Sequence, residues 1–454
     1  METNTRAANK TSPSRAQMLT FVSFGHFIND GMVFFIPVIA AILAKHDGAS
    51  ELLVTVVLTV FYVASAGFGI IAGRIADSLG RRGILIAFGI FVLSVGLVGF
   101  YLSLTVAPGM GSDFFAIAGA LIAGIGSSFY HPIGGSLVQL AYDNKSRGAA
   151  LGINGAFGSL GRALYPSLFF LVAALAISQI STIAIFAIIG MTSALLIGYG
   201  LARLPSRANR EEKTDVVAPS LGSDIDPASV SVANPTQPFS QPSSTADSSY
   251  SANPPSFKSL LNKSVLALTI IAFFRSMAFI GIVSWIPIYL TTQKHLGLSS
   301  HLGYTVTIMY AGGILGQPIF GQLVDRFDKR VVLSANSILS AISILAYINL
   351  SGAGAIVSLI FFGFFTFSGF PLLLSLVSDY VPKGSSSVGN ALVWGLGSTG
   401  GQALGPLVVG LLIFGSYANL STVFAIMAGV AALTILATPL MAKTEKHGKM
   451  PLFG

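Results

Sequence analysis

The sequence predicts an all-α polytopic membrane protein in which twelve transmembrane helices form two six-helix halves. Of the 454 residues, 53% are hydrophobic and only 9% are charged, and the mean hydropathy is +0.77. This composition excludes a soluble globular protein. Apolar stretches of roughly 20 residues, the length that crosses a bilayer, recur along the chain.

The predicted spans follow one another along the chain, in most cases with short polar turns between them. They cover residues 17–43, 52–72, 83–106, 114–141, 148–176, 178–202, 264–291, 302–323, 331–349, 353–378, 387–415 and 419–441. We expect an N-terminal bundle over 17–203 and a C-terminal bundle over 263–442, with tails at 1–16 and 443–454. The linker, 204–262, is rich in Ser, Pro, Ala and Asn at its centre, which predicts disorder.

The basic residues predict the orientation. Of the 25 Lys and Arg residues, Lys45 and Lys294 alone fall on one side of the spans, Arg162 and Arg275 fall within spans, and the rest lie on the other side. The positive-inside rule then places both termini in the cytoplasm. We expect the protein in the plasma or inner membrane. The polar segment before Gln17 has no cleavable apolar core, so we expect no secretory signal peptide. The net charge of +8 is a topology signal and predicts no nucleic-acid partner. The absence of cysteine excludes disulfides.

The first span carries a pair of titratable residues on one helix face. His26 and Asp30 are four residues apart, with Asn29 beside them, so their side chains can share a proton. The fourth span carries His131 followed by Pro132, and the proline breaks the helix and frees the Ser128 carbonyl. Ionisable groups at bilayer depth typically mark substrate or proton pathways, although His131 could also be a neutral imidazole satisfied by a neighbouring helix.

The two halves repeat one another. The turn after the second span, Gly73 to Arg82, matches the turn after the eighth span, Gly321 to Arg330. Likewise Gly161-Arg-Ala-Leu-Tyr-Pro matches Gly401-Gln-Ala-Leu-Gly-Pro. Parallel repeats are typical of a transporter class whose site lies between the halves. We predict that residues of the duplicated turns form the gates that close the cytoplasmic side. They are Gly73, Asp77, Arg81, Arg82, Asp325 and Arg326. The alternative is that both turns are simply solvated.

With these motifs the sequence resembles the major facilitator superfamily over nearly its whole length outside the linker and tails. The His26-x-x-x-Asp30 pair, the Phe-Tyr-His-Pro around His131 and the Gly-Arg-Ala-Leu-x-Pro of the fifth span resemble, more narrowly, the fosmidomycin resistance protein family of drug exporters. The sequence departs from the superfamily pattern at Ser78, where an arginine is usual, and at Tyr165, where the signature associated with antiporters has a glycine.

Four charged or titratable residues are expected at one depth. At about 1.5 Å per residue, Asp30 lies about 22 Å from Arg15, and His131, Arg162 and Arg275 also come near the midplane. The resemblance places the helices of Asp30 and Arg162 close together, so these residues can form an ion pair, either a permanent structural one or one that protonation of Asp30 opens. A freed Arg162 would clamp a phosphonate, phosphate or carboxylate. Arg275 would contact the substrate from the second half or snorkel toward the cytoplasm.

We therefore predict a proton-coupled exporter of small anionic or amphipathic compounds that works by alternating access, as a monomer. Proton-coupled uptake of an organic anion is the alternative, and an intramembrane enzyme using His26, Asp30 and His131 is a third interpretation. The duplicated turns argue against an enzyme. No phosphate-binding loop of the ATPase type occurs, and we expect neither a cofactor nor a metal. The expected substrate contacts are Arg162, Arg275, Tyr130, Asn29, Trp285 and Trp394.

Overall fold

The computed structural model describes residues 15–46, 49–142, 146–175, 178–202, 262–381 and 391–443. Within these ranges the regular elements are all helical, which confirms the predicted fold class. The predicted linker, except Asn262, and most of both predicted tails lie outside the described residues.

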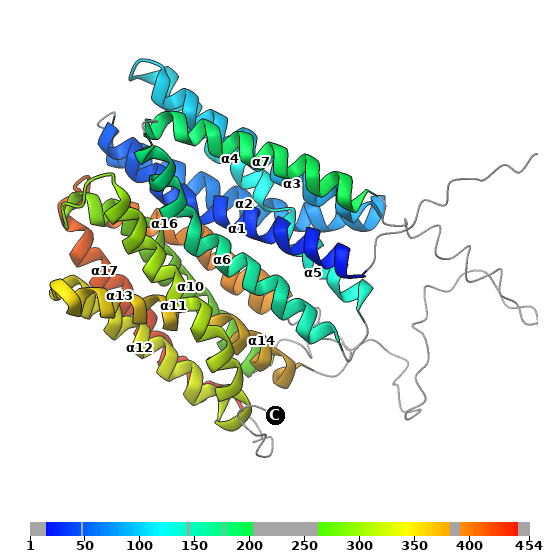
Figure 1. The fold of residues 1–454 in the computed structure, drawn as a ribbon. Coiled ribbons are helices and arrows are strands. Elements are labelled where there is room, and N and C mark those ends of the chain that lie inside the picture. The colour runs from blue at the N-terminus through cyan, green and yellow to red at the C-terminus, as the bar shows by residue number, and fades with distance from the viewer. Residues whose placement is uncertain are drawn as a thin grey trace, which may run out of the picture.

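A helix lies at each predicted span (Figure 1). The N-terminal half contains α1 (Arg15–His46), α2 (Glu51–Leu79), α3 (Arg82–Thr105), α4 (Met110–Ser127), α5 (Tyr130–Ala141), α6 (Arg147–Ala174) and α7 (Gln179–Leu201). The C-terminal half contains α10 (Lys263–Thr292), α11 (Ser300–Arg326), α12 (Lys329–Asn349), α13 (Gly352–Phe367), α14 (Gly369–Tyr380), the π-helix η1 (Ala391–Thr399), α16 (Gly400–Leu412), the short η2 (Tyr417–Asn419), α17 (Leu420–Leu433) and η3 (Thr434–Leu440).

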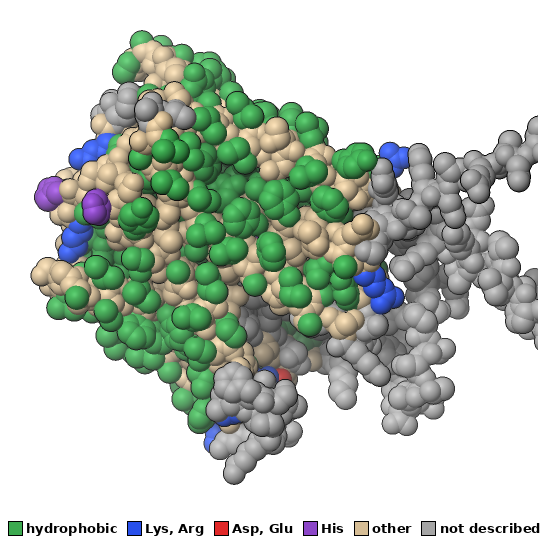
Figure 2. Space-filling view, in the orientation of Figure 1, with side chains coloured by type: hydrophobic (Ala, Val, Ile, Leu, Met, Phe, Trp, Pro, Cys, Tyr) green, Lys and Arg blue, Asp and Glu red, His purple; other side chains and the backbone are tan. Residues whose placement is uncertain are grey.

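By length and composition, 9 of the described helical segments can cross a membrane. Figure 2 shows a broad band of hydrophobic side chains over the middle of the visible face, with the visible Lys and Arg side chains near its ends. Such a band matches a bilayer that covers the sides of the bundle. The protein is therefore a multi-pass membrane protein.

Two of the predicted spans are broken at equivalent places. The fourth span divides at Ser128 and Phe129 into α4 and α5, and the tenth divides at Ser368 into α13 and α14. Each break is followed within four residues by a proline, Pro132 or Pro371, which supplies no backbone N–H donor to the helix. The sequence predicted the first of these breaks.

Close helix contacts repeat between the halves because small residues repeat. A Cβ atom added to Gly161 of α6 would collide with the Phe27 carbonyl of α1, and one added to Gly401 of α16 would collide with the Phe273 carbonyl of α10. The glycines therefore let α1 pack directly against α6 in the N-terminal half, and α10 against α16 in the C-terminal half. At the departure from the superfamily pattern, the Tyr165 ring packs against Gly31.

The two halves meet mainly through α6 with α11, α2 with α16, and α1 with α10. We call the side of the bundle where α1 and α10 begin the basic side and the opposite side the far side. Hydrogen bonds between described residues join the halves from the middle of the bundle to the far side. They are Ser167 with Thr307 at 2.7 Å, the Gln179 amide to the Leu298 carbonyl at 2.5 Å, and the Tyr310 and Tyr417 hydroxyls to the Phe34 and Ala49 carbonyls, each at 3.5 Å. The seam is thus closed on the far side.

Candidate functional site

The predicted residues of α1, α5 and α6 meet around one buried carboxylate. Asp30 is 1% exposed, and its oxygens lie 3.3 Å from His26 Nε2, 3.4 Å from His131 Nε2 and 3.6 Å from Arg162 Nη1. The Asn29 amide donates to the same carboxylate at 3.1 Å. One acid is therefore shared by three groups that can carry a positive charge. We call Asp30, His26, His131 and Arg162 the Asp30 cluster.

The position of His26 is fixed by its second ring nitrogen. His26 Nδ1 lies 2.7 Å from the Asn154 backbone carbonyl, which can only accept a hydrogen bond, so the tautomer with the proton on Nδ1 is assigned from this partner. In a neutral His26, the lone pair of Nε2 would then face the Asp30 carboxylate. An attractive contact requires a proton on Nε2 or on the carboxylate. The geometry therefore builds a place for a proton between these two residues.

Tyr130 packs against one face of the His26 ring and helps to hold it in this position. Its ring stacks on His26 with centroids 4.6 Å apart, and its hydroxyl contacts the Val22 carbonyl at 2.8 Å and the Asn154 side-chain oxygen at 2.9 Å. Tyr130 is 2% exposed, so in this conformation it packs against His26 and is closed to a substrate. Its predicted substrate contact stays a prediction.

His131 is the accessible member of the cluster. The break between α4 and α5 puts it at the start of α5, where 62% of its side chain is exposed although the ring contacts the buried Asp30. His131 therefore combines an exposed surface with a direct contact to the buried carboxylate.

Arg162 connects the cluster to the other half of the protein. Its Nη2 atom donates to the Ser159 hydroxyl at 2.7 Å. The guanidinium lies over the Phe34 ring of α1 at 5.2 Å and over the Phe367 ring of α13 at 5.6 Å. The charge of Arg162 is thus shared between an acid and an aromatic pair that spans the seam.

Arg275 lies inside the C-terminal half. It is 4% exposed, and its Nη2 atom contacts the Asn336 side-chain oxygen at 2.6 Å and the carbonyls of Phe365 and Thr366 at 3.4 and 3.3 Å. These carbonyls belong to the last turn of α13, where the helix ends and its carbonyls lack N–H partners within the helix. Arg275 neither snorkels nor pairs with Asp30 in this conformation. Its predicted substrate contact stays a prediction for another state of the cycle.

The remaining predicted contacts are unevenly placed. Asn29 and Trp285 are each 0% exposed, and the Trp285 indole donates to the Pro406 carbonyl at 3.2 Å. Trp394 is partly exposed and packs beside the apolar core of the C-terminal half. The structure therefore brings Asn29 to the Asp30 cluster and leaves both tryptophans among the packing residues of the C-terminal half.

The predicted gate residues lie in or beside the ends of α2 and α11, and α2 runs further than the span predicted from the sequence. Helix α2 continues to Leu79, so Asp77 lies in its last turn, where it is 76% exposed and pairs with Arg82 at 2.9 Å within the same half. Gly73 and Arg81 lie beside this pair along the chain. Asp325 and Arg326 end α11, and the side chain of Asp325 is outside the described residues. Among the described residues, the ion pair of Asp77 thus stays within its own half.

Three donors of the cluster have the composition of a metal site. The candidate ligand atoms of His26, Asp30 and His131 lie within 4.8 Å of one another. The sequence predicted no metal, and the Arg162 guanidinium approaches the same carboxylate, which disfavours a second cation there.

Sequence reasoning missed Asn154, Ser159, Phe34 and Phe367. Asn154 is an amide buried at 5% exposure in α6, eight residues before Arg162, and that position was a usable signal. The two phenylalanines had none, because the chain contains 33 of them.

Comparison with known proteins gives the same fold. Solved transporter structures cover almost the whole chain, and two of them serve as examples. A bacterial homolog of the human lysosomal transporter Spinster, inward-facing and unoccupied, has 14% identity and a TM-score of 0.64, covering 94% of this chain and 95% of its own. The xylose transporter XylE from E. coli, in an inward-open conformation, has 13% identity and a TM-score of 0.68, covering 95% and 97%.

No curated protein matches the chain. The sequence matches the Major Facilitator Superfamily over residues 19–400 and again over 291–452, which covers most of both halves. This match identifies a transporter, as the sequence predicted, and it rules against the interpretation as an intramembrane enzyme. The chain belongs to the Major Facilitator Superfamily.

Proposed function

We propose that this transporter is a proton-coupled exporter of small anionic or amphipathic organic compounds, and that the Asp30 cluster couples the proton to the substrate. The observation that carries the proposal is the sharing of one buried carboxylate by His26, His131 and Arg162 at 3.3 to 3.6 Å. Buried ionisable groups in a membrane are costly, and a shared acid that can change partners gives that cost a function.

The proton step follows from the partners of His26. With Nδ1 committed to the Asn154 carbonyl, a proton that arrives through the exposed His131 can be held between His26 and Asp30. Neutralising the carboxylate weakens its hold on Arg162. Loss of the proton restores that ion pair. Each turn of the cycle thus alternates Arg162 between Asp30 and another anion.

The substrate class follows from Arg162 and its surroundings. A guanidinium is a bidentate donor for phosphonate, phosphate or carboxylate groups. Phe34 and Phe367 flank it with apolar surface, which suits the carbon skeleton of an amphipathic compound. Because Phe367 belongs to the C-terminal half, a compound bound here would touch both halves, as alternating access requires.

By the positive-inside rule we assign the basic side to the cytoplasm of the cell membrane. The far-side seam, which the described hydrogen bonds join, would then lie away from the cytoplasm. The same cluster also serves proton-coupled uptake of an organic anion, and the direction of coupled movement distinguishes the two.

The test is transport by the purified protein in vesicles with an imposed pH gradient, using a panel of phosphonates, dyes and organic acids. Export predicts that a compound moves opposite to the proton and that vesicle pH changes when the compound is added. Movement in the same direction as the proton would replace export by uptake. Movement of a panel compound at one rate with or without the gradient, and with no pH change, would overturn proton coupling.

A further inference from the structure

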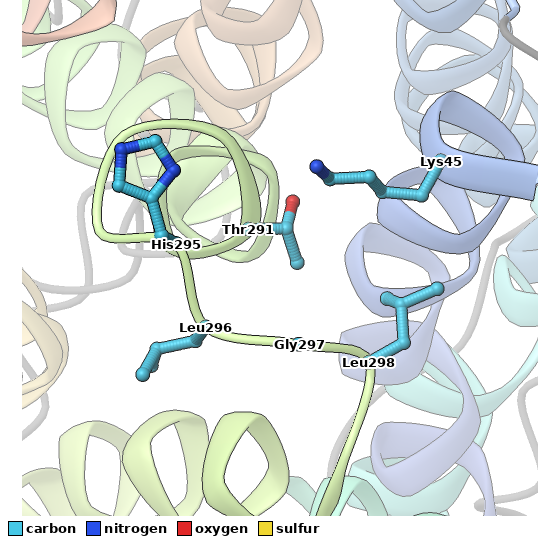
Figure 3. A pocket seen from close by; sticks show the side chains of 6 residues that line it. All are labelled: Lys45, Thr291, His295, Leu296, Gly297 and Leu298. Carbon is cyan, nitrogen blue, oxygen red and sulfur yellow. The ribbon is translucent and has the colours of Figure 1, made fainter.

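A pocket of about 320 Å³ opens at the seam on the far side (Figure 3). Its volume is in the range of small-molecule sites. One wall is Lys45 near the end of α1, in the N-terminal half, and the other is the end of α10 and the loop that follows it, in the C-terminal half. Its lining residues are Lys45, Thr291, His295, Leu296, Gly297 and Leu298.

The pocket presents positive charge without a counter-charge in its lining. Figure 3 shows the Lys45 ammonium reaching from α1 toward the Thr291 hydroxyl, with the His295 ring beyond it. No acidic residue lines the pocket, and Lys45 makes no ion pair with any residue that the structure describes. By contrast, the other far-side lysine is held by aromatic rings, with the Lys294 ammonium 5.8 Å from Tyr289 and 5.6 Å from Tyr347.

The conformation of the loop opposite Lys45 is preorganised by hydrogen bonds within the protein. His295 has a φ of 53°, a left-handed conformation that a non-glycine residue keeps only when its surroundings hold it. Here the N–H of Leu296 donates to the Leu290 carbonyl at 2.9 Å, and Gln179 of the other half donates to the Leu298 carbonyl at 2.5 Å. The shape of the loop is therefore fixed by contacts on both sides of the seam.

The same loop offers unused backbone donors. Within the described chain, the N–H groups of His295, Gly297 and Leu298 donate no hydrogen bond to the protein. Those of Gly297 and Leu298 are consecutive, and successive free N–H groups in a turn can form a concave binding site for an anion. A lysine, an imidazole and free N–H groups around one pocket form a set of donors that fits an oxyanion.

We propose that this pocket binds an oxyanion of the phosphate, sulfate or carboxylate class through the Lys45 ammonium, the His295 ring and the N–H groups of Gly297 and Leu298. Because the donors come from both halves, the site is complete only while the far-side seam is closed. A bound anion therefore stabilises the conformation in which the far-side seam is closed. The site is separate from the Asp30 cluster and does not depend on the proposed function.

The test measures binding of radiolabelled sulfate to the full-length protein in phosphatidylcholine nanodiscs, at fixed ionic strength. Saturable binding should weaken about tenfold or more in Lys45→Gln and in His295→Gln, which corresponds to at least about 1.4 kcal/mol. Lys294→Gln is the matched control and should bind as the parent does. Absence of saturable binding, or equal binding by the parent and Lys45→Gln, would overturn the proposal.

Two further arms test the seam and the source of the anion. A side chain at Gly410 would collide with Thr55 across the seam, so Gly410→Trp should weaken sulfate binding without changing a lining residue. Unchanged binding in this variant would overturn the claim that both halves build the site. In nanodiscs containing phosphatidylglycerol, reduced sulfate binding by the parent identifies a lipid headgroup phosphate as an occupant, and unchanged binding identifies a free anion. Either result in this last arm agrees with an oxyanion site.

Discussion

The Nε2 atom of His26 lies 3.3 Å from the Asp30 carboxylate, while Nδ1 of the same ring lies 2.7 Å from a backbone carbonyl. Both neighbours are hydrogen-bond acceptors, so the ring bridges them favourably only when a proton is present between Nε2 and the acid. The proton requirement comes from the position of Asn154, which holds the ring in place. It is the physical basis for the coupling that we propose.

Tyr130 should contribute to stability through its hydroxyl. Tyr130→Phe removes the hydrogen bonds to Val22 and Asn154 while keeping the ring that stacks on His26. We expect a loss of about 1 kcal/mol in the free energy of unfolding. Thermal unfolding in detergent measures it, and an unchanged melting temperature would show that these hydrogen bonds add nothing.

Gly161 should not tolerate a methyl group. Gly161→Ala places a Cβ against the Phe27 carbonyl, and we expect overpacking to cost about 1 to 3 kcal/mol and to lower the melting temperature. Gly155 on the same helix has no atom within 4 Å of such a Cβ, so Gly155→Ala is the matched control. Alanine has the higher helix propensity, so Gly155→Ala should lose no stability. Equal losses in both variants would mean that the contact between α1 and α6 does not decide the result.

These contacts show what the sequence could predict and what it could not. The spans and the break before Pro132 were predictable because hydrophobicity and proline act locally along the chain. Depth along a helix correctly put Asp30, His131 and Arg162 at one level. Depth did not show that Arg275 points into its own half, because the direction of a side chain depends on the rotation of the helix and on its neighbours.

The partners of the cluster are a second example. The carbonyl of Asn154 meets His26 across two helices, and Phe367 reaches Arg162 across the seam between the halves. Neither contact follows from a spacing in the sequence. Both require the relative placement of helices, which a single sequence does not encode in any local pattern.

Asp77 should act on the cycle and not on the site. It is exposed and pairs only with Arg82 among the described residues, so Asp77→Asn should leave substrate affinity unchanged and slow turnover by altering the balance between the two conformations. We expect the same of Asp325→Asn. Asp113→Asn, an exposed acid on the far side, is the control. A changed affinity with normal turnover would contradict the assignment.

Removal of both members of the ion pair should be less damaging to folding than removal of Asp30 alone. Asp30→Asn leaves the Arg162 guanidinium partly buried at 19% exposure without its acid. Because stranding a buried charge costs more than removing both partners, Asp30→Asn with Arg162→Gln should recover the expression level that the single variant loses. Quantitative blotting of membranes measures this. Lower expression of the double variant than of Asp30→Asn would rule out a stranded charge as the cause.

The most direct test of the account is substrate accumulation by Asp30→Asn in vesicles with an imposed pH gradient. The asparagine cannot release a proton, so accumulation driven by the gradient should be lost, while exchange of labelled for unlabelled compound, which needs no net proton movement, should continue. Accumulation by Asp30→Asn at the wild-type rate would contradict the account and would place the proton site elsewhere, with His131 and His26 the next residues to change.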